Sequence, residues 1–353
     1  MTNAQYPYGN QSPPGGQPYP YGPQGAQPQD SYVLQQLSEK RRIRLLSSGA
    51  ALATGGFLLL ANLLYLPYLF LVNRNVLNGA TEAERVMNMS VDLLITLVAL
   101  FLPFYLLNRI YKNRMSIEPV NLGKPKTGTV DTLLLLVAGF GMMMLADVVT
   151  GYLSSFFQDA TGAEFAYDFF ATPTSALGVA IYAVRSTLFP AIFEEYAMRG
   201  VVMNSLRRYG DMFAILMSAM MFGLMHGNMV QVPFAFAAGI VLGYVVIRTE
   251  TLWTGVAIHF LNNSFSIIYS LLYDNGHESV AETFSLIGTY GGLALGVVCL
   301  IILFVRKKMT RPAPNRSFLR TKQCVGAFFL TIPMIVILIY MVVQTALMVK
   351  FPS

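Results

Sequence analysis

Two adjacent carboxylates, Glu194 and Glu195, stand within one of the longest apolar stretches of the chain, and Arg199 follows one helical turn later. Charged side chains inside a membrane-spanning helix are costly unless they pair or face a polar cavity, and they therefore mark a candidate functional site. Glu195 and Arg199 are four residues apart, so they share a helix face and are expected to form a supporting ion pair. Glu194 is turned about 100° away from Glu195, which makes it the candidate for chemistry.

Two of the three histidines in the chain, His226 and His259, also lie within apolar runs. Asn263 follows His259 by four residues, so one helix presents both side chains to the same site. Peptide hydrolysis needs a base for the water, an acid for the leaving amine and a donor for the oxyanion. A carboxylate with an imidazole can move the protons, and an imidazole with an amide can form an oxyanion hole.

The composition predicts the elements that must position these residues. Hydrophobic residues make up 54% of the chain and charged residues 12%, whereas a soluble domain carries about 25% charged residues. We expect an all-α, polytopic transmembrane helix bundle of about eight or nine spans. The expected spans are residues 46–72, 91–111, 131–153, 176–202, 212–228, 231–248, 252–273, 287–305 and 324–348.

The fifth of these spans is short and hard to separate from the sixth. Glu194 would lie about eight residues, or roughly 12 Å, from one end of its span, and His259 at a similar depth. Counted from residue 212, His226 would lie too deep to meet them. Either the fifth helix begins below the membrane surface or it is bent.

Successive connections between the expected spans are alternately rich and poor in Lys and Arg, and this pattern predicts the orientation of the chain in the membrane. These residues gather before the first span and in every second connection, and the other connections are poorer in Lys and Arg and several are acidic. By the positive-inside rule the N-terminus is cytoplasmic and the C-terminus is outside. The net charge of +6 therefore reflects the orientation of the chain in a cell membrane and does not indicate nucleic-acid binding. The expected partner is the lipid bilayer.

The three polar patterns resemble the motifs of the CAAX-protease and bacteriocin-processing family, also called the CPBP or Abi family. Residues 194–199 match its EExxxR motif, residues 222–226 match FxxxH, and residues 259–263 match HxxxN, in the family's order. The resemblance implies an intramembrane endopeptidase, similar to type II CAAX prenyl endopeptidases, that acts on a membrane-embedded or lipidated peptide. It also implies that Glu194 and His226 activate water and that His259 and Asn263 stabilise the oxyanion.

The resemblance divides the chain into four regions. Residues 130–275 form the protease-like core, between N-terminal transmembrane helices at 39–129 and C-terminal ones at 276–353. Residues 1–38 are rich in Pro, Gly, Gln and Tyr, and we expect a disordered tail there because such a segment cannot bury enough apolar surface. The tail and the short loops favour a bacterial membrane.

A metal requirement stays open at this point. Two histidines and a carboxylate can hold a catalytic zinc ion, but HExxH is absent, so no single helix presents a zinc-protease site. Cys299 and Cys324 have no metal-type spacing. The mechanism in which glutamate and histidine activate water requires no ion, so no cofactor is certain.

Two other classes of function remain as alternatives. The chain could be a non-catalytic bacteriocin-immunity or membrane scaffold protein, although the complete motif set argues against loss of catalysis. It could also be an ion-coupled transporter whose buried acids bind ions or protons. Paired inverted repeats would favour the transporter, and the sequence contains no convincing internal repeat.

Overall fold

A computed structural model describes residues 28–73, 81–115, 117, 121–162, 164–165, 172–227 and 231–350. The elements of the first half are α1 (Pro28–Asn73), α2 (Glu82–Met115), α3 (Thr129–Thr161), β1 (Glu164–Phe165), α4 (Ala176–Ala183), η1 (Val184–Leu188), α5 (Phe189–Glu195), η2 (Tyr196–Met203), α6 (Asn204–Leu206) and η3 (Arg207–Tyr209). Those of the second half are α7 (Asp211–Met225), α8 (Val232–Thr249), α9 (Leu252–Asp274), α10 (Glu278–Leu286), η4 (Ile287–Gly291), α11 (Gly292–Val305), α12 (Thr321–Phe329), α13 (Ile332–Met348) and β2 (Val349–Lys350).

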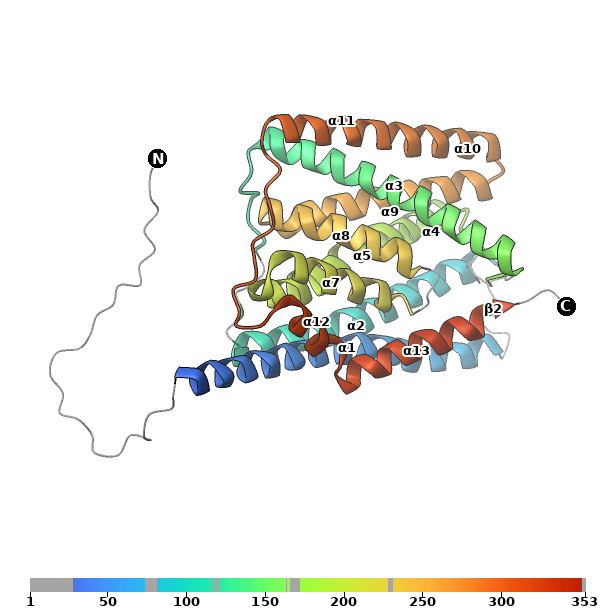
Figure 1. The fold of residues 1–353 in the computed structure, drawn as a ribbon. Helices are drawn as coiled ribbons and strands as arrows, with labels where there is room; N and C mark the ends of the chain where they lie inside the picture. The colour runs from blue at the N-terminus through green and yellow to red at the C-terminus, as the bar shows by residue number, and fades with distance from the viewer. Residues whose placement is uncertain are drawn as a thin grey trace.

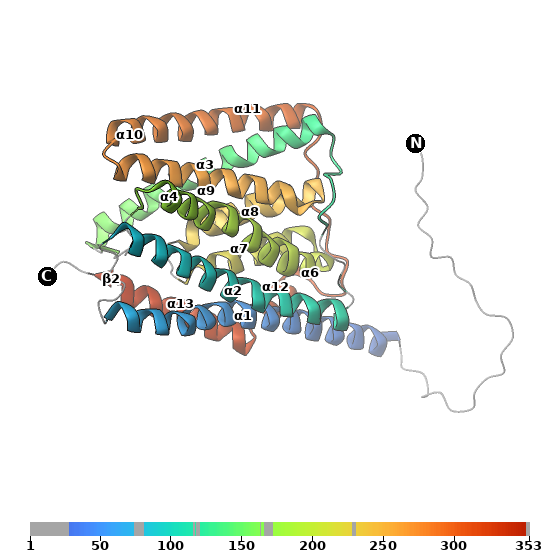
Figure 2. The ribbon, with the colours of Figure 1, turned by 180° about the vertical axis from the view of Figure 1, so that it is seen from behind.

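The all-α transmembrane bundle predicted from the composition is confirmed. Seven helices of the described residues are long and apolar enough to cross a membrane, and α12 with α13 makes an eighth span if this pair, bent by 69°, counts as one. They lie side by side, and with the short α7 included each helix runs opposite to the one before it (Figures 1 and 2). Strand structure in the described residues is limited to β1 and β2, which pair over two residues each.

Two expectations from the sequence need correction. The expected span at 212–228 is α7, whose 15 residues reach only about 22 Å, short of a hydrocarbon core of about 30 Å. Most of α7 is buried, and it lies near the centre of the bundle (Figure 1). The expected disorder of residues 1–27 falls outside the described residues. Residues 28–38 instead begin α1, where Gln36 donates to the Phe318 carbonyl and Tyr32 packs edge-on against the Phe318 ring.

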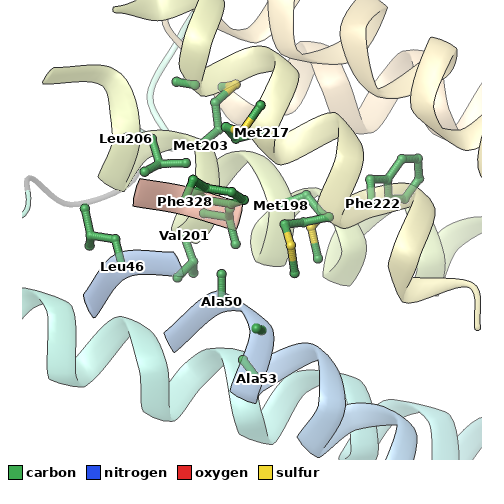
Figure 3. Packing of buried hydrophobic residues seen from close by; sticks show 14 of the residues in the cluster. Leu46, Ala50, Ala53, Met198, Val201, Met203, Leu206, Met217, Phe222 and Phe328 are labelled. Atoms are coloured by element: carbon green, nitrogen blue, oxygen red, sulfur yellow. The ribbon is translucent and has the colours of Figure 1, made fainter. Parts of the chain in front are cut away.

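The largest apolar core surrounds α7 and joins it to α1, η2 and α12. Figure 3 shows members of this core: Met198 and Met203 of η2, Met217 of α7 and Ala50 of α1. Methionine is unbranched and fills irregular gaps, which suits a place where a short helix, a π-helical turn and a long helix meet. A second core lies between α3, α8, α9 and α11.

Helix direction sorts the connections to the two ends of the bundle. The α2–α3, η3–α7, α8–α9 and α11–α12 connections share one end with the start of α1, as the colours in Figure 1 show. Lys and Arg lie in or directly beside these connections, among them Lys126, Arg208, Arg248 and Arg311, and we call this end the basic end. The α9–α10 turn and the end of α13 lie at the opposite end (Figure 1).

Ion pairs hold the basic end together. Arg208 donates to Glu39 at 2.5 Å, Lys126 to Glu250 at 2.5 Å, and Arg306 and Lys308 flank Asp131 at 3.0 and 3.4 Å. Each of these pairs joins residues far apart in the sequence. Deeper in the bundle, Arg185 of η1 pairs with Asp92 of α2.

The orientation of the basic end is testable with single cysteines. In a chain without Cys299 and Cys324, Arg311→Cys marks the basic end and Glu278→Cys the opposite one, and both positions are exposed. We expect a membrane-impermeant thiol reagent on intact cells to label Glu278→Cys only, because Lys and Arg in short loops favour the cytoplasm. Labelling of Arg311→Cys alone would reverse the orientation.

Candidate active site

Two π-helical segments flank the short helix that carries both glutamates. Helix α5 lies between η1 and η2, within one continuous helical rod from Ala176 to Tyr209. Single π-turns inside α-helices are frequent at functional sites. Pro190, in the first turn of α5, has no N–H to donate to a carbonyl of η1. Glu194 lies near the middle of this rod, deeper than the expected eight residues from its end, because the helix continues beyond residue 202.

Glu195 is the most enclosed acid of the site. Its side chain is fully buried, and Oε1 accepts from Arg199 Nη1 at 2.7 Å and lies 3.1 Å from His259 Nδ1. The expected supporting ion pair is therefore present, and it also contacts the histidine. Gly255, one turn before His259 on α9, permits the approach: a Cβ there would lie 2.8 Å from Glu195 Oε2.

Glu194 takes a different position from its neighbour. Its side chain is 18% exposed, and Oε2 lies 3.7 Å from His259 Nε2. Because Glu195 engages Nδ1, Nε2 is the ring nitrogen that faces Glu194. A separation of 3.7 Å exceeds a direct hydrogen bond and suits a bridging water. The His259 imidazole thus lies between two carboxylates, with Nδ1 facing Glu195 and Nε2 facing Glu194.

Phe222 connects the end of α7 to this group. Its ring packs edge-on against His226 at 5.1 Å and against His259 at 5.7 Å between centroids, and the Arg199 guanidinium lies 4.6 Å above its centre. The Phe222 carbonyl lies 2.9 Å from His226 Nδ1, which fixes the orientation of that imidazole. Through the Phe222 ring, the last turn of the short α7 reaches His259, so the end of this helix does not lie too deep to meet α9.

The two asparagines of α9 contact each other. Asn262 is buried and donates from Nδ2 to Asn263 Oδ1 at 3.3 Å, while Asn263 is half-buried. Since this contact takes the amide oxygen, the Asn263 N–H₂ group is the one left to donate elsewhere. Sequence reasoning missed the packing role of Phe222 and the need for Gly255. The glycine's position one turn before a histidine on the same helix face was the available signal.

The donor set fits a catalytic zinc ion poorly. A catalytic site takes three protein ligands, and the described residues contain no group of three or more His, Cys, Asp or Glu side chains that could hold a metal ion. No step of the proposed reaction is therefore assigned to a metal.

A polar pocket of about 320 Å³ connects the basic end with Arg199. Asn121, Asn204, Arg207 and Glu250 are among its lining residues, and Glu194 is not. Within the described part of the chain, Arg199 Nε is buried without a hydrogen-bond partner. The pocket thus brings polar surroundings to the ion pair from the side on which we predict the cytoplasm.

Removal of one partner tests the structural role of the buried pair. We expect Glu195→Ala to lower the unfolding free energy by about 3–5 kcal/mol, because it leaves Arg199 charged and unpaired. The double variant Glu195→Ala/Arg199→Met should recover part of this loss. Unfolding in detergent measures both, with the exposed Glu278→Ala as control. A Glu195→Ala protein as stable as wild type would contradict this role.

Comparisons with known proteins agree with the motifs. Residues 176–265 match the family model described as type II CAAX prenyl endopeptidase Rce1-like. The membrane-embedded CAAX protease MroQ of Staphylococcus aureus (strain USA300) is 23% identical over 184 residues, which cover 50% of this chain and 72% of MroQ. A candidate membrane peptidase, YdiL of Bacillus subtilis (strain 168), is 26% identical over 94 residues, covering 26% of this chain and 38% of YdiL.

No solved structure matches the chain. The family model spans all three motifs up to Asn263, and it includes α5, η2, α7 and most of α9. With several apolar membrane-spanning helices and bacterial membrane-protease relatives, the chain is a multi-pass membrane protein. Over residues 176–265 the chain is similar to the type II CAAX prenyl endopeptidase Rce1-like family, as its sequence motifs predict.

Proposed function

We propose that this protein is an intramembrane endopeptidase that hydrolyses a peptide bond of a membrane-embedded or lipidated peptide. The observation that carries the proposal is the position of His259, whose two ring nitrogens lie 3.1 Å from Glu195 and 3.7 Å from Glu194. The Glu195 carboxylate is buried and holds the His259 ring, whereas the Glu194 carboxylate is partly exposed and can contact a water molecule. This division of roles is typical of a catalytic group with its orienting partner.

In the proposed reaction, Glu194 and His226 activate the water. Glu194 accepts a proton as the water oxygen bonds to the substrate carbonyl carbon, and the carbonyl oxygen becomes an oxyanion. His259 in its imidazolium form donates from Nδ1 to Glu195 and from Nε2 to that oxygen, and the Asn263 amide donates a second hydrogen bond to it. The C–N bond then breaks, and the proton held by Glu194 passes to the leaving amine, which returns the carboxylate to its starting state.

Glu195 and Arg199 act on this reaction through His259. Glu195 holds Nδ1, so the ring cannot turn Nε2 away from Glu194 without breaking a buried contact. The polar backbone of a peptide is tolerated at this depth only inside a cavity. The partial exposure of Glu194 is consistent with such access, and the substrate's anchor in the bilayer would hold the scissile bond at the level of the site.

Substitution of the proposed base tests the function. We expect Glu194→Gln to reduce cleavage at least about 100-fold, because the amide cannot accept the proton of the water. Its thermal unfolding should stay close to that of wild type, since Glu194 makes no buried ion pair with Arg199. Comparison of peptides released in membranes with wild-type and Glu194→Gln protein would identify a substrate, whose cleavage is then measured in liposomes.

Two further variants sharpen this test. Asn263→Ala should lower the turnover number by about 100- to 1,000-fold, as loss of one oxyanion donor does, and exposed Glu278→Gln should have no effect. Wild-type cleavage by Glu194→Gln would refute the assignment. Identical peptide profiles for both membranes would favour the non-catalytic immunity or scaffold alternative.

Chelation tests metal dependence separately. We expect the purified protein to keep its activity after extensive treatment with a chelator and to contain less than stoichiometric zinc, because the described residues lack a three-donor site. Activity lost on chelation and restored by zinc alone would instead make Glu194, His226 and His259 metal ligands.

A further inference from the structure

A long groove lies between α1 and α2, outside the candidate active site. Its volume is about 900 Å³, and its walls are formed by residues 37–53 of α1 and 103–115 of α2. Both views place these two helices side by side at one edge of the bundle (Figures 1 and 2). Leu52 and Leu106 of its lining are more than half exposed, so the groove faces the bilayer rather than another helix.

The groove is positively charged at one end. Arg41, Arg42 and Arg114 line it near the basic end, and its lining contains no acidic residue. Arg42 donates to the Met115 carbonyl at 2.8 Å, which fixes one guanidinium at the mouth. Arg41 and Arg114 are exposed and form no ion pair with any described residue.

Beyond the arginines the lining is apolar. From Arg42 to Ala53 the α1 wall runs eleven residues, or about 16 Å, close to the roughly 15 Å of half a hydrocarbon core. The floor forms where the helices meet: Tyr111 donates to the Leu46 carbonyl at 2.6 Å, and a Cβ on Gly49 would lie 2.6 Å from Tyr111 Oη. The groove therefore matches one leaflet in length and in polarity.

We propose that this groove binds an anionic phospholipid of the leaflet at the basic end. The phosphate contacts Arg41 and Arg114, and an acyl chain lies along the leucines of both helices. Guanidinium groups are well suited to phosphate oxygens, and basic clusters between membrane helices attract anionic headgroups. The site is independent of the proposed proteolysis, since no residue of the three motifs lines it.

Native mass spectrometry of the full chain tests the site with phosphatidylglycerol and phosphatidylcholine of the same acyl chains. Wild type should retain phosphatidylglycerol preferentially, because phosphatidylcholine carries no net charge. Arg41→Gln/Arg114→Gln should bind phosphatidylglycerol about tenfold more weakly. The control Arg311→Gln/Lys322→Gln removes the same charge from the same end outside the groove, and should bind like wild type.

Further measurements distinguish a bound lipid from a bound free anion. They also exclude misfolding of a variant as the cause of weaker binding. Ser48→Phe, which fills the apolar part while keeping all three arginines, should also weaken binding. Soluble glycerol phosphate should not displace the lipid, and each single arginine variant should show an intermediate loss at unchanged thermal stability. Equal binding of both lipids, displacement by glycerol phosphate, or equal losses in the groove and control variants would overturn the proposal.

Discussion

The ion pair between Glu195 and Arg199 is the interaction on which the centre of the molecule depends. Both side chains are buried almost completely, and two charges taken out of water are stable only when other polar groups surround them. Arg199 donates a second hydrogen bond to the Gly239 carbonyl of α8 at 3.3 Å and lies over the Phe222 ring of α7. Glu195 contacts His259 of α9. One ion pair therefore holds four helical segments in register.

Small residues allow these segments to come close enough. A Cβ on Gly239 would lie 2.8 Å from Ala219 Cα, so α8 packs directly on the backbone of α7. A Cβ on Gly255 would meet Glu195. Close packing of backbones at small residues is a general route to stable helix contacts in membranes, where no hydrophobic effect separates helix from lipid. Here the close packing also brings the Gly239 carbonyl to Arg199 and the His259 imidazole to Glu195.

The adjacent glutamates differ because the helix turns between them. Glu195 points to the interior, where Arg199 and His259 enclose it, while Glu194 keeps 18% of its side-chain surface exposed. A structural acid and a candidate reactive acid thus occupy consecutive positions, and His259 contacts both. The π-helical turns on either side of α5 place this pair within a rod that otherwise runs as a regular span.

The helical elements and the pairings within one helix follow from the amino-acid sequence alone. Composition fixed the membrane class, apolar length located the long helices, and four-residue spacing predicted the Glu195–Arg199 pair, because these properties depend on the chain's own periodicity. The alternation of Lys and Arg predicted which connections share an end. The family motifs indicated which residues would gather, although not how they touch.

How the helices of different motifs meet depends on the packing of the whole bundle. The short α7 ends inside the bundle, so Phe222 lies between His226 and His259. The partner of Arg185 is Asp92, about ninety residues away. Neither result follows from periodicity, because contacts between helices depend on their crossing positions and on the small residues at which they approach. For the same reason, the sequence identified His259 as a candidate site residue but could not show that Glu195 contacts its Nδ1.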